Sequence, residues 1–316
     1  MLLSSDGFVL AGHINPDGDA IGSCLALGMA LKNMGKTVHV LLESFSNKFS
    51  VIPGCDLIYS GSIEELDFNV FIALDCGATD RLGESAKLLS RAKIVACIDH
   101  HASHESFAPY TCLDPLASST CELVYQLISP LGLLDDAIAS AIYAGICTDT
   151  GGFRYESCGS YAMGIVSELL KLKVPSTDIY NGLMMSRSLI EAKVLSRAVE
   201  KLQMHEGGKI AATFMCADDL NELGAGSQEA GGVAAYLLNI EGVEASLFIY
   251  EKARGCLKAS FRAHTLEVMG VAERFGGGGH KLAAGCVVYG DITKVFIEML
   301  DSLKAAYIQM QAPLAN

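Results

Sequence analysis

Residues 8–23, "FVLAGHINPDGDAIGS", place a short apolar run directly before a polar turn and the start of a helix pattern. The turn holds one histidine and two like-charged carboxylates, His13, Asp17 and Asp19, and a proline and a glycine break regular structure between them. An apolar strand that stops at such a turn and continues into a helix is typical of a parallel β-α-β unit. The stretch therefore predicts an α/β fold that begins with a buried strand, followed by a helix that ends at Gly35.

Three further apolar runs predict neighbouring strands of the same sheet. Residues 36–42 ("KTVHVLL"), 68–76 ("FNVFIALDC") and 93–101 ("KIVACIDHH") are rich in apolar residues, and the last two stop at charged side chains. Strands buried on both faces have this pattern, so we expect an N-terminal parallel sheet with helices on both faces. Helical patterns follow near residues 119–128, 136–147 and 161–172.

A second domain is expected after residues 171–178, "KLKVPSTD", which interrupt the alternation of strands and helices. Residues 186–208 have an amphipathic pattern and predict one long helix between the domains. We therefore expect a parallel-sheet domain at 1–180, a connecting helix at 181–206 and a smaller mixed α/β domain at 207–316. In the smaller domain, strands are expected near 209–216, 243–251, 256–263 and 284–289, and helices near 229–239, 265–274 and 291–306.

The composition favours a folded protein of the cell interior. The 316 residues are 51% hydrophobic, which is enough for two domain cores. No apolar run reaches the roughly 20 residues that span a bilayer, and no signal-peptide pattern opens the sequence, so we expect a cytoplasmic protein without a membrane partner. Eleven cysteines, none of them in a C-x-x-C pair, are expected to be free thiols in a reducing compartment.

The charge of the chain limits the kind of phosphate compound that it can bind. The net charge is −13, and residues 1–180 hold 10 basic and 21 acidic side chains. Proteins that bind long nucleic acids without sequence preference are usually basic, so this class is not favoured. A phosphate-containing partner would need bound divalent cations, and we expect them in the more acidic half.

Metal-ligand residue types gather where the apolar segments of this half end. For any one of them a structural role, such as capping a helix, is the simpler interpretation. Together, so many carboxylates and imidazoles at one sheet edge would repel and desolvate one another without a counter-charge. We expect two divalent ions that share a carboxylate, and the mixed ligand set favours Mn²⁺, with Co²⁺ or Mg²⁺ as alternatives. The residues concerned are His13, Asp17, Asp19, Asp75, Asp99, His100, His101 and Asp149.

Two segments of the second half are candidates for anion binding. Residues 275–286, "FGGGGHKLAAGC", hold four consecutive glycines before His280. Such a run can leave backbone N–H groups open to an anion, or it can be only a flexible turn. In residues 257–264, "LKASFRAH", Arg262 and His264 lie near the end of a predicted strand. Arg262 could bind a phosphate through two hydrogen bonds, or it could be an ordinary surface side chain.

These motifs together resemble the DHH phosphoesterase superfamily. The matching stretches are "HINPDGDAIGS", "ALDCG", "IDHH", "TDTGGF", "SFRA" and "FGGGGHKLAAG", in the order found in that superfamily. Within it, the chain looks most similar to the NrnA-type branch, the bifunctional nanoRNases (oligoribonucleases) and pAp phosphatases with a DHH-associated C-terminal domain. The related family II pyrophosphatases share the first four stretches but lack the glycine–histidine element.

The resemblance implies a two-metal site in the first domain. Asp99 would orient a histidine, and His101 would face the substrate phosphate. Together with the shared metal ligand Asp75, these would be the catalytic residues. The implied metal ligands are His13 and Asp17 for one ion, Asp19, His100 and Asp149 for the other, and Asp75 for both.

The resemblance also implies that the second domain binds the nucleotide part of the substrate across a cleft between the domains. The implied substrates are short single-stranded RNA or DNA oligonucleotides, cleaved to nucleoside monophosphates, and pAp, which would lose its 3′-phosphate to give AMP. The implied substrate-binding residues are Arg262, Gly277, Gly278, Gly279 and His280.

The chain departs from the superfamily pattern at three places. Only seven residues precede Phe8, His104 stands where many relatives have asparagine, and Ala263 stands where many have serine. The last two concern the substrate side, so they bear on substrate preference. Two alternatives therefore stay open, a phosphodiesterase of linear or cyclic dinucleotides such as pApA and pGpG, and a non-catalytic nucleotide-binding module. A homodimer is a further expectation.

Overall fold

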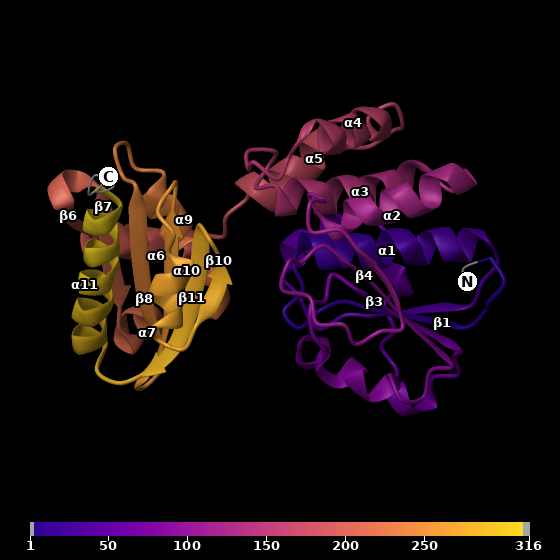
Figure 1. Cartoon of the computed structure of the whole chain (residues 1–316), viewed down its shortest axis with the longest axis horizontal. Helices are drawn as coiled ribbons and strands as arrows, with labels where there is room; N and C mark the ends of the chain where they lie inside the picture. Colours follow the sequence, from indigo (N-terminus) through magenta and orange to yellow (C-terminus); the bar gives the residue numbers. More distant parts are fainter. Residues whose placement is uncertain (1–2, 312–316) are drawn as a thin grey trace, which may run out of the picture. The chain divides into compact units, whose positions relative to one another are not determined.

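The computed structural model describes residues 3–311, and the chain divides into two compact units between Ser186 and Arg187 (Figure 1). Each unit has its own sheet and its own apolar clusters. Among the described residues, no helix is both long and apolar enough to cross a membrane.

The first unit is built on a five-stranded sheet with the strand order β2-β1-β3-β4-β5, and every neighbouring pair is parallel. This confirms the predicted parallel sheet. The edge strand β5 was not predicted, because its sequence "YTCL" is short and exposed at every position, without the continuous apolar pattern of a buried strand. The strands are β1 (Phe8–Ala11), β2 (Val38–Leu41), β3 (Val70–Leu74), β4 (Ile94–Asp99) and β5 (Tyr110–Leu113).

Alternate residues of the strands pack into two different apolar layers. Phe8 and Leu10 of β1 belong to the cluster formed with the α-helices, whereas Val9 and Ala11 belong to a cluster formed with short 3₁₀-helices. Helices therefore cover both faces, as predicted, although on one face they are 3₁₀-helices. The α-helices are α1 (Gly18–Asn33), α2 (Thr120–Ile128), α3 (Asp136–Asp149), α4 (Ser160–Leu169) and α5 (Ser176–Tyr180); the 3₁₀-helices are Asn47–Val51, Cys55–Leu57, Ile63–Glu65, Thr79–Leu88 and Ser129–Leu131, and a π-helix covers Asn181–Met185.

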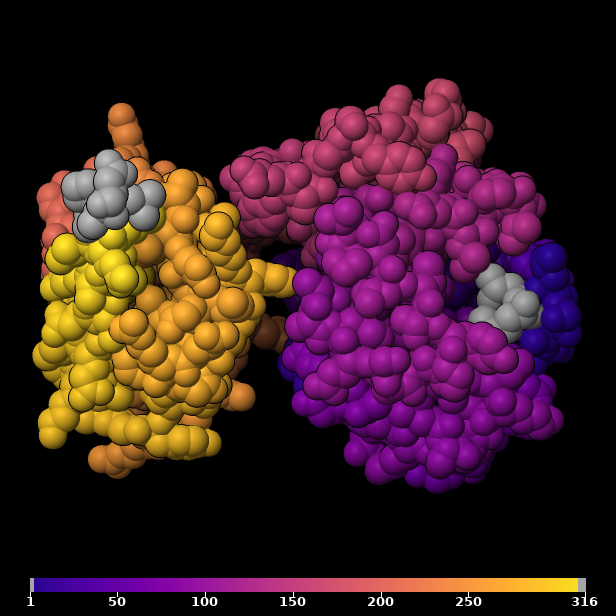
Figure 2. Space-filling view, in the orientation of Figure 1, coloured from indigo at the N-terminus to yellow at the C-terminus, as the bar shows by residue number. Residues whose placement is uncertain are grey.

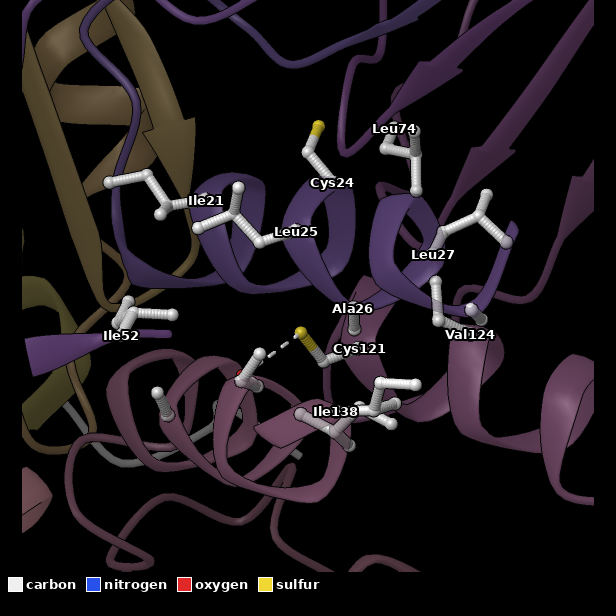
Figure 3. Close-up of a cluster of buried hydrophobic side chains, with 14 of the residues drawn as sticks. Ile21, Cys24, Leu25, Ala26, Leu27, Ile52, Leu74, Cys121, Val124 and Ile138 are labelled. Carbon is white, nitrogen blue, oxygen red and sulfur yellow. Dashed lines mark hydrogen bonds between the residues drawn. The ribbon is translucent and has the colours of Figure 1, made fainter. Parts of the chain in front are cut away.

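Helices α1 and α3 pack closely because both contain glycine where they meet. A Cβ atom at Gly22 would lie 2.6 Å from the carbonyl oxygen of Ala141 in α3, and one at Gly145 would lie 2.8 Å from Oδ1 of Asp19 in α1. Figure 3 shows the surrounding apolar side chains of α1, α2 and α3. A Cβ atom at Gly18 would in turn touch Thr148, so the first residues of α1 meet the last residues of α3.

The second unit is a six-stranded mixed sheet with the order β10-β11-β9-β8-β7-β6, in which only β7 and β8 are parallel neighbours. The four predicted strands are confirmed as β7, β8, β9 and β11. Helix α11, yellow in Figure 2, contributes to the apolar cluster on one face, and α6, α7 and α9 contribute to that on the other. The strands are β6 (Gln203–His205), β7 (Ile210–Met215), β8 (Ala245–Ala253), β9 (Cys256–Ala263), β10 (Gly278–His280) and β11 (Ala283–Tyr289), and the helices are α6 (Leu189–Glu200), α7 (Ala217–Leu223), α8 (Ser227–Ala230), α9 (Val233–Leu238), α10 (Met269–Glu273) and α11 (Ile292–Gln311).

The prediction of one long connecting helix was wrong. Helix α6 is shorter, because Ser188 and Glu191 form a capping box that starts it, and the chain leaves the helix after Glu200. Residues 203–205 then form β6, which pairs with β7 and completes the sheet edge. Val194 of α6 is fully buried within a cluster of the second unit, so this helix belongs to that unit and is not a separate connector.

Two other helices differ from their predicted extent. The one expected at 229–239 is divided at Gly231 and Gly232 into α8 and α9, because glycine weakens a helix interior. The one expected at 265–274 is reduced to α10, and the segment before it contains no helix.

The contact between α1 and α3 can be tested by adding a methyl group. We expect Gly22→Ala to lower the free energy of unfolding by about 1–3 kcal/mol, because the Cβ would press on the backbone of α3. The matched control is Gly164→Ala in α4, where no atom lies within 4 Å of the added carbon. This control should gain up to about 1 kcal/mol from helix propensity, as measured by chemical denaturation. Equal effects of the two substitutions would show that the α1–α3 contact tolerates a methyl group.

Candidate active site

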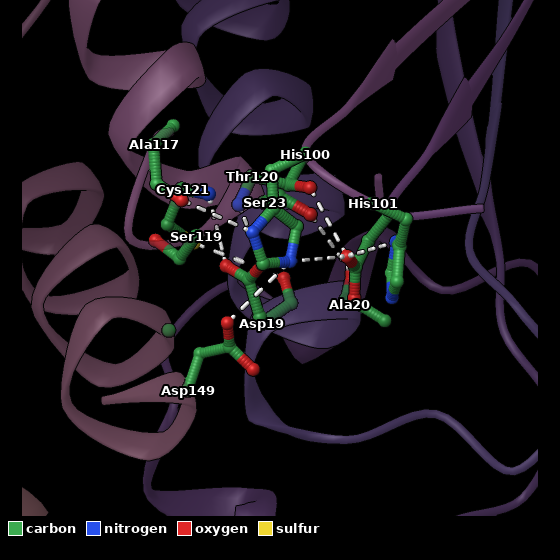
Figure 4. A network of polar contacts seen from close by, with 12 residues as sticks. Asp19, Ala20, Ser23, His100, His101, Ala117, Ser119, Thr120, Cys121 and Asp149 are labelled. Carbon is green, nitrogen blue, oxygen red and sulfur yellow. Dashed lines mark hydrogen bonds and ion pairs between the residues drawn. The ribbon is translucent and has the colours of Figure 1, made fainter. Parts of the chain in front are cut away.

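The predicted metal-ligand residues of the first unit lie together at one edge of its sheet. His13 follows β1, Asp75 follows β3, and Asp99 is the last residue of β4, so the carboxyl ends of three neighbouring parallel strands supply side chains to one place. Asp17 and Asp19 come from the start of α1, and Asp149 is the last residue of α3. Figure 4 shows part of this cluster, with Asp19, Asp149 and His100 directed toward one another and His101 to one side of them.

One group of possible metal ligands consists of His13, Asp17 and Asp75. Nε2 of His13 lies 3.8 Å from Oδ1 of Asp17 and 3.5 Å from Oδ2 of Asp75. Nδ1 of the same ring lies 2.8 Å from the carbonyl oxygen of Ile14, which can only accept a hydrogen bond. In the tautomer that donates to Ile14, the lone pair of Nε2 is directed at the two carboxylates, as a metal ligand requires.

A second group consists of Asp19, His100 and Asp149. Nε2 of His100 lies 4.0 Å from Oδ2 of Asp19 and 3.4 Å from Oδ2 of Asp149. Its Nδ1 faces the carbonyl oxygen of Ala117 at 3.3 Å, so this ring too presents Nε2 to carboxylates. Oδ1 of Asp75 lies 3.6 Å from the same Nε2. Asp75 thus reaches both groups, one with each oxygen.

Backbone geometry and hydrogen bonds fix these carboxylates in place. Asp75 has a φ of 55°, a left-handed conformation that costs a non-glycine residue about 1–3 kcal/mol and is concentrated at functional sites. The Asp19 carboxylate accepts hydrogen bonds from the backbone N–H groups of Thr120 and Cys121 at the start of α2. Asp17 caps α1 by accepting from two backbone N–H groups, so its structural role and its proposed ligand role coexist.

The electrostatics of the cluster favour bound cations. Burial, with the negative charge of Asp75 close by, raises the pKa of Asp19 to about 7. Burial and the charge of Asp19 raise the pKa of Asp149 to about 9. Burial opposes the ionisation of Asp75 as well. The contact with His13 and the positive charge of that ring outweigh burial, so the pKa of Asp75 is lowered. The donor set of imidazole nitrogens and carboxylate oxygens therefore fits divalent cations, which would remove this repulsion.

Asp99 is fully buried and holds the imidazole of His101 at its Oδ1, with a distance of 2.7 Å to Nδ1. The histidine that Asp99 contacts is thus His101, and a role for Asp99 in orienting it stays a prediction. The His104 imidazole lies on the other oxygen, with Nδ1 2.6 Å from Oδ2. Its contact with Asp99 was not predicted, since the sequence indicates only that a histidine follows the "DHH" stretch at a short distance.

The sequence analysis also missed Arg81 and Thr120. Nη2 of Arg81 lies 3.2 Å from Nδ1 of His13, which places a permanent positive charge beside the first ligand group. The Thr120 hydroxyl donates to Oδ1 of Asp75 at 3.1 Å. Neither residue belongs to a recognisable motif, and both reach the site from loops or helix ends whose position the sequence does not reveal.

The glycine run of the second unit is a turn that leads into a strand, because Gly276 lies in a turn and Gly278 is the first residue of β10. Gly278–His280 form β10 at the sheet edge and pair with β11. A Cβ atom at Gly277 would lie 2.2 Å from the carbonyl oxygen of Gly285, and one at Gly279 would lie 2.6 Å from that of Ala283, so these two glycines serve close strand packing. At Gly278 the Cβ position is open space, so close packing does not explain why this residue is a glycine. Arg262 lies on β9, directly opposite Ala283 in the pairing with β11.

Comparison with known proteins identifies the family. The DHH family, N-terminal domain, matches residues 8–146, and the DHHA1 domain matches residues 207–309. The chain belongs to the DHH phosphoesterases. The predicted resemblance is thereby confirmed, and the "DHH" of the family is Asp99, His100 and His101 in this chain.

Individual relatives of this DHH phosphoesterase extend over nearly the whole chain. The bifunctional oligoribonuclease and PAP phosphatase NrnA of Thermus thermophilus is 29% identical over 301 residues, 93% of this chain and 88% of the relative. The cyclic-di-AMP phosphodiesterase PdeA of Listeria monocytogenes is 25% identical over 89% of this chain but only 44% of the relative. The solved structure of an exopolyphosphatase-related protein from Bacteroides fragilis has a TM-score of 0.87 and 28% identity, covering 98% of this chain and 93% of that one. The last similarity confirms the predicted fold class.

The raised pKa values predict how the metal-free protein responds to pH. A group whose pKa is raised by folding stabilises the protein below its unfolded pKa, and this contribution is lost as pH rises through the folded pKa. Asp19 and Asp149, with pKa values of about 7 and about 9, act in this direction, as do His13 and His100. We expect the Tm in EDTA to fall between about pH 5 and about pH 9, and added Mn²⁺ to restore more stability at the higher pH.

The variant that tests this effect is Asp149→Asn. Its neutral side chain should raise the Tm of the metal-free protein at alkaline pH and reduce the gain in Tm that Mn²⁺ gives, because one charge and one ligand are removed. The exposed Asp67→Asn variant serves as the control and should change neither quantity. A pH-independent Tm in EDTA would contradict the assignment of a mutually repelling carboxylate cluster.

Proposed function

We propose that this protein is a metal-dependent phosphoesterase that cleaves short oligoribonucleotides to nucleoside monophosphates and converts pAp to AMP. The observation that carries the proposal is the position of Asp75. Its Oδ2 lies 3.5 Å from Nε2 of His13 and its Oδ1 lies 3.6 Å from Nε2 of His100. A carboxylate shared in this way can hold two cations close enough to act on the attacking and the leaving oxygen of one phosphoryl group.

The residues of the first unit divide into two ligand sets around Asp75. In both sets the histidine presents Nε2, because Nδ1 faces a backbone carbonyl oxygen. The mixture of imidazole and carboxylate donors favours Mn²⁺, with Co²⁺ or Mg²⁺ as alternatives. When bound, such ions supply charge for the phosphoryl oxygens and lower the pKa of a water molecule. One set is His13, Asp17 and Asp75, and the other is Asp19, His100, Asp149 and Asp75.

Two further side chains are proposed to contact the phosphate. His101 is oriented by Asp99 and can donate a hydrogen bond to a phosphoryl oxygen as negative charge develops there. The guanidinium of Arg81, beside His13, can neutralise a second oxygen. Both donors belong to the first unit, so the phosphate can be bound and activated by residues of that unit.

The second unit is proposed to bind the nucleotide part of the substrate. Gly278 leaves open space next to the backbone of an edge strand, and His280 is exposed at the end of the same strand. Arg262 lies on β9, two strands away in the same sheet. The flanking Gly277 and Gly279 contribute by allowing β10 to approach β11 closely.

The charge of the chain supports a short substrate. A net charge of −13 repels a long nucleic acid, whereas a fragment of a few nucleotides needs only a local group of cations. The similarity to an oligoribonuclease and PAP phosphatase over 93% of this chain agrees with short RNA and pAp as substrates.

A second candidate function is hydrolysis of linear or cyclic dinucleotides. It is supported by the similarity to a cyclic-di-AMP phosphodiesterase, which extends over 89% of this chain. The same metal-ligand residues would serve this reaction, so only a comparison of substrates separates the two. A non-catalytic nucleotide-binding module is a weaker alternative, because the residues for both ligand sets are present and close together.

One assay tests the proposal. Full-length protein with Mn²⁺ is compared on pAp, pApA, a labelled trinucleotide, a long single-stranded oligonucleotide, a cyclic dinucleotide and pyrophosphate. We expect hydrolysis of pAp and the trinucleotide, little action on the long strand, and loss of activity with EDTA. Asp75→Asn should lose at least about 10³-fold in kcat, because both ligand sets depend on this carboxylate, whereas Asp67→Asn should match the wild type.

The outcomes of this assay separate the alternatives. Full activity in EDTA would contradict the metal mechanism. Hydrolysis of dinucleotides without hydrolysis of pAp would support the second candidate, and tight binding of pAp without any turnover would indicate a binding module.

The role of the second unit can be tested at His280. His280→Ala should keep the bound metals but lose about tenfold or more in kcat/KM on a trinucleotide, since a hydrogen bond involving a charged group contributes about 1.5–3 kcal/mol. Hydrolysis of bis-p-nitrophenyl phosphate should change much less, because this small substrate has no nucleotide to bind. His264→Ala is the matched control, since that ring contacts the Leu238 carbonyl oxygen within its own unit. Equal losses on both substrates, or none, would refute a nucleotide-binding role for His280.

A further inference from the structure

The buried carboxylate of Asp99 holds two imidazoles at once, one on each oxygen. Oδ1 accepts a hydrogen bond from Nδ1 of His101 at 2.7 Å, and Oδ2 accepts one from Nδ1 of His104 at 2.6 Å. The Asp99 side chain is fully buried, and that of His104 is only 3% exposed. The reaction proposed above uses His101 and Asp99 but gives His104 no role.

The positions of the protons follow from the chemistry of the contacts. An ionised carboxylate only accepts hydrogen bonds, so the proton in each contact belongs to Nδ1 of the imidazole. In His104 this leaves Nε2 buried, without a hydrogen-bond partner among the described residues. Buried polar atoms of this kind are uncommon and need a reason. Because Nε2 makes no hydrogen bond, we attribute the burial of the His104 ring to the hydrogen bond that its Nδ1 donates to Asp99.

The Asp99 carboxylate is held at both of its oxygens. Oδ1 accepts hydrogen bonds from the backbone N–H groups of His100 at 2.9 Å and His101 at 3.3 Å, in addition to Nδ1 of His101. The contact with His104 is the one that fixes Oδ2, so it adds to the restraint that keeps Oδ1 on the His101 ring. His101 has a competing acceptor close by, because Oδ1 of Asp75 lies 3.7 Å from the same Nδ1. If the His101 ring turned to Asp75, it would donate to Oδ1 of Asp75. That oxygen would then not be available to bind a cation, as the proposed function requires.

The loop that carries His104 is itself anchored. The backbone N–H of His104 donates to the carbonyl oxygen of His101 at 3.2 Å, and that of Glu105 donates to the carbonyl oxygen of Gly77 at 2.7 Å. The His104 ring also lies beside Phe107, with 5.6 Å between ring centroids. The imidazole is therefore held against Asp99 by the fold of the loop.

We propose that His104 is a positioning residue for phosphoester hydrolysis. Through Oδ2 of Asp99 it keeps Oδ1 on His101, and so keeps the His101 ring away from Asp75. The proposal rests on the proposed function for what His101 does in the reaction. The placement of protons on the two rings can be measured without any substrate.

Kinetics of two variants test the role in hydrolysis. In His104→Asn the amide nitrogen takes the place of Nδ1 and can still donate to Asp99, whereas His104→Leu has similar size and no donor. With Mn²⁺ and pAp, the asparagine variant should keep kcat within about threefold, and the leucine variant should lose about tenfold or more in kcat with little change in KM. The control is His205→Leu in β6, another histidine with a buried Nε2 that has no described partner, and it should leave kcat unchanged.

Nitrogen-15 NMR of the metal-free, full-length protein gives a second measurement. We expect His101 and His104 of the wild type to carry their protons on Nδ1. His101 should keep this tautomer in His104→Asn and lose it in His104→Leu. If the leucine variant does not fold, His104→Gln takes its place, because its amide group lies where Nε2 was and does not replace the donor at Nδ1.

The outcomes are distinct. A proton on Nε2 of His104 in the wild type, or equal behaviour of the asparagine and leucine variants in both measurements, would overturn the proposal. Failure of the wild type to hydrolyse any substrate would defeat the proposed function, and the NMR result would still decide whether His104 orients His101 through Asp99.

Discussion

Repulsion between carboxylates that share a small, largely buried volume is the constraint on which this structure depends. Asp17, Asp19, Asp75 and Asp149 come from three separate parts of the chain and meet at one sheet edge. Burial, together with the negative charge of neighbouring carboxylates, raises the pKa of Asp19 to about 7 and that of Asp149 to about 9. A fold that keeps such a cluster needs a compensating positive charge, and imidazoles directed at these carboxylates through Nε2 are suited to share a cation with them.

The rest of the first unit holds this cluster together. The close contact of α1 and α3 at Gly22 and Gly145 brings the start of one helix to the end of the other, which places Asp19 near Asp149. The strained backbone of Asp75 turns its side chain so that the two oxygens face different histidines. Core packing and local backbone strain therefore both determine where the carboxylates of the site lie.

The sequence predicted which histidines and aspartates of the first unit lie together, because these residues stand where apolar runs end and parallel strands bring such ends together. It could not reveal contacts made by irregular segments, such as that of Arg81 with His13. Short edge strands were missed because β10 is largely glycine and lacks a period-two pattern. The prediction of a long helix was wrong because the amphipathic pattern continues past Glu200, although the backbone beyond it forms β6 and pairs with β7.

The hydrogen bonds from α2 to Asp19 give one carboxylate two tasks. The same side chain that is proposed to hold a cation also joins α1 to the start of α2 through the backbone N–H groups of Thr120 and Cys121. Protonation of Asp19 in the absence of a cation weakens these charge-assisted contacts and loosens the helix layer. Proteases act on loosened segments, so the resistance of the protein to proteolysis would follow the supply of metal.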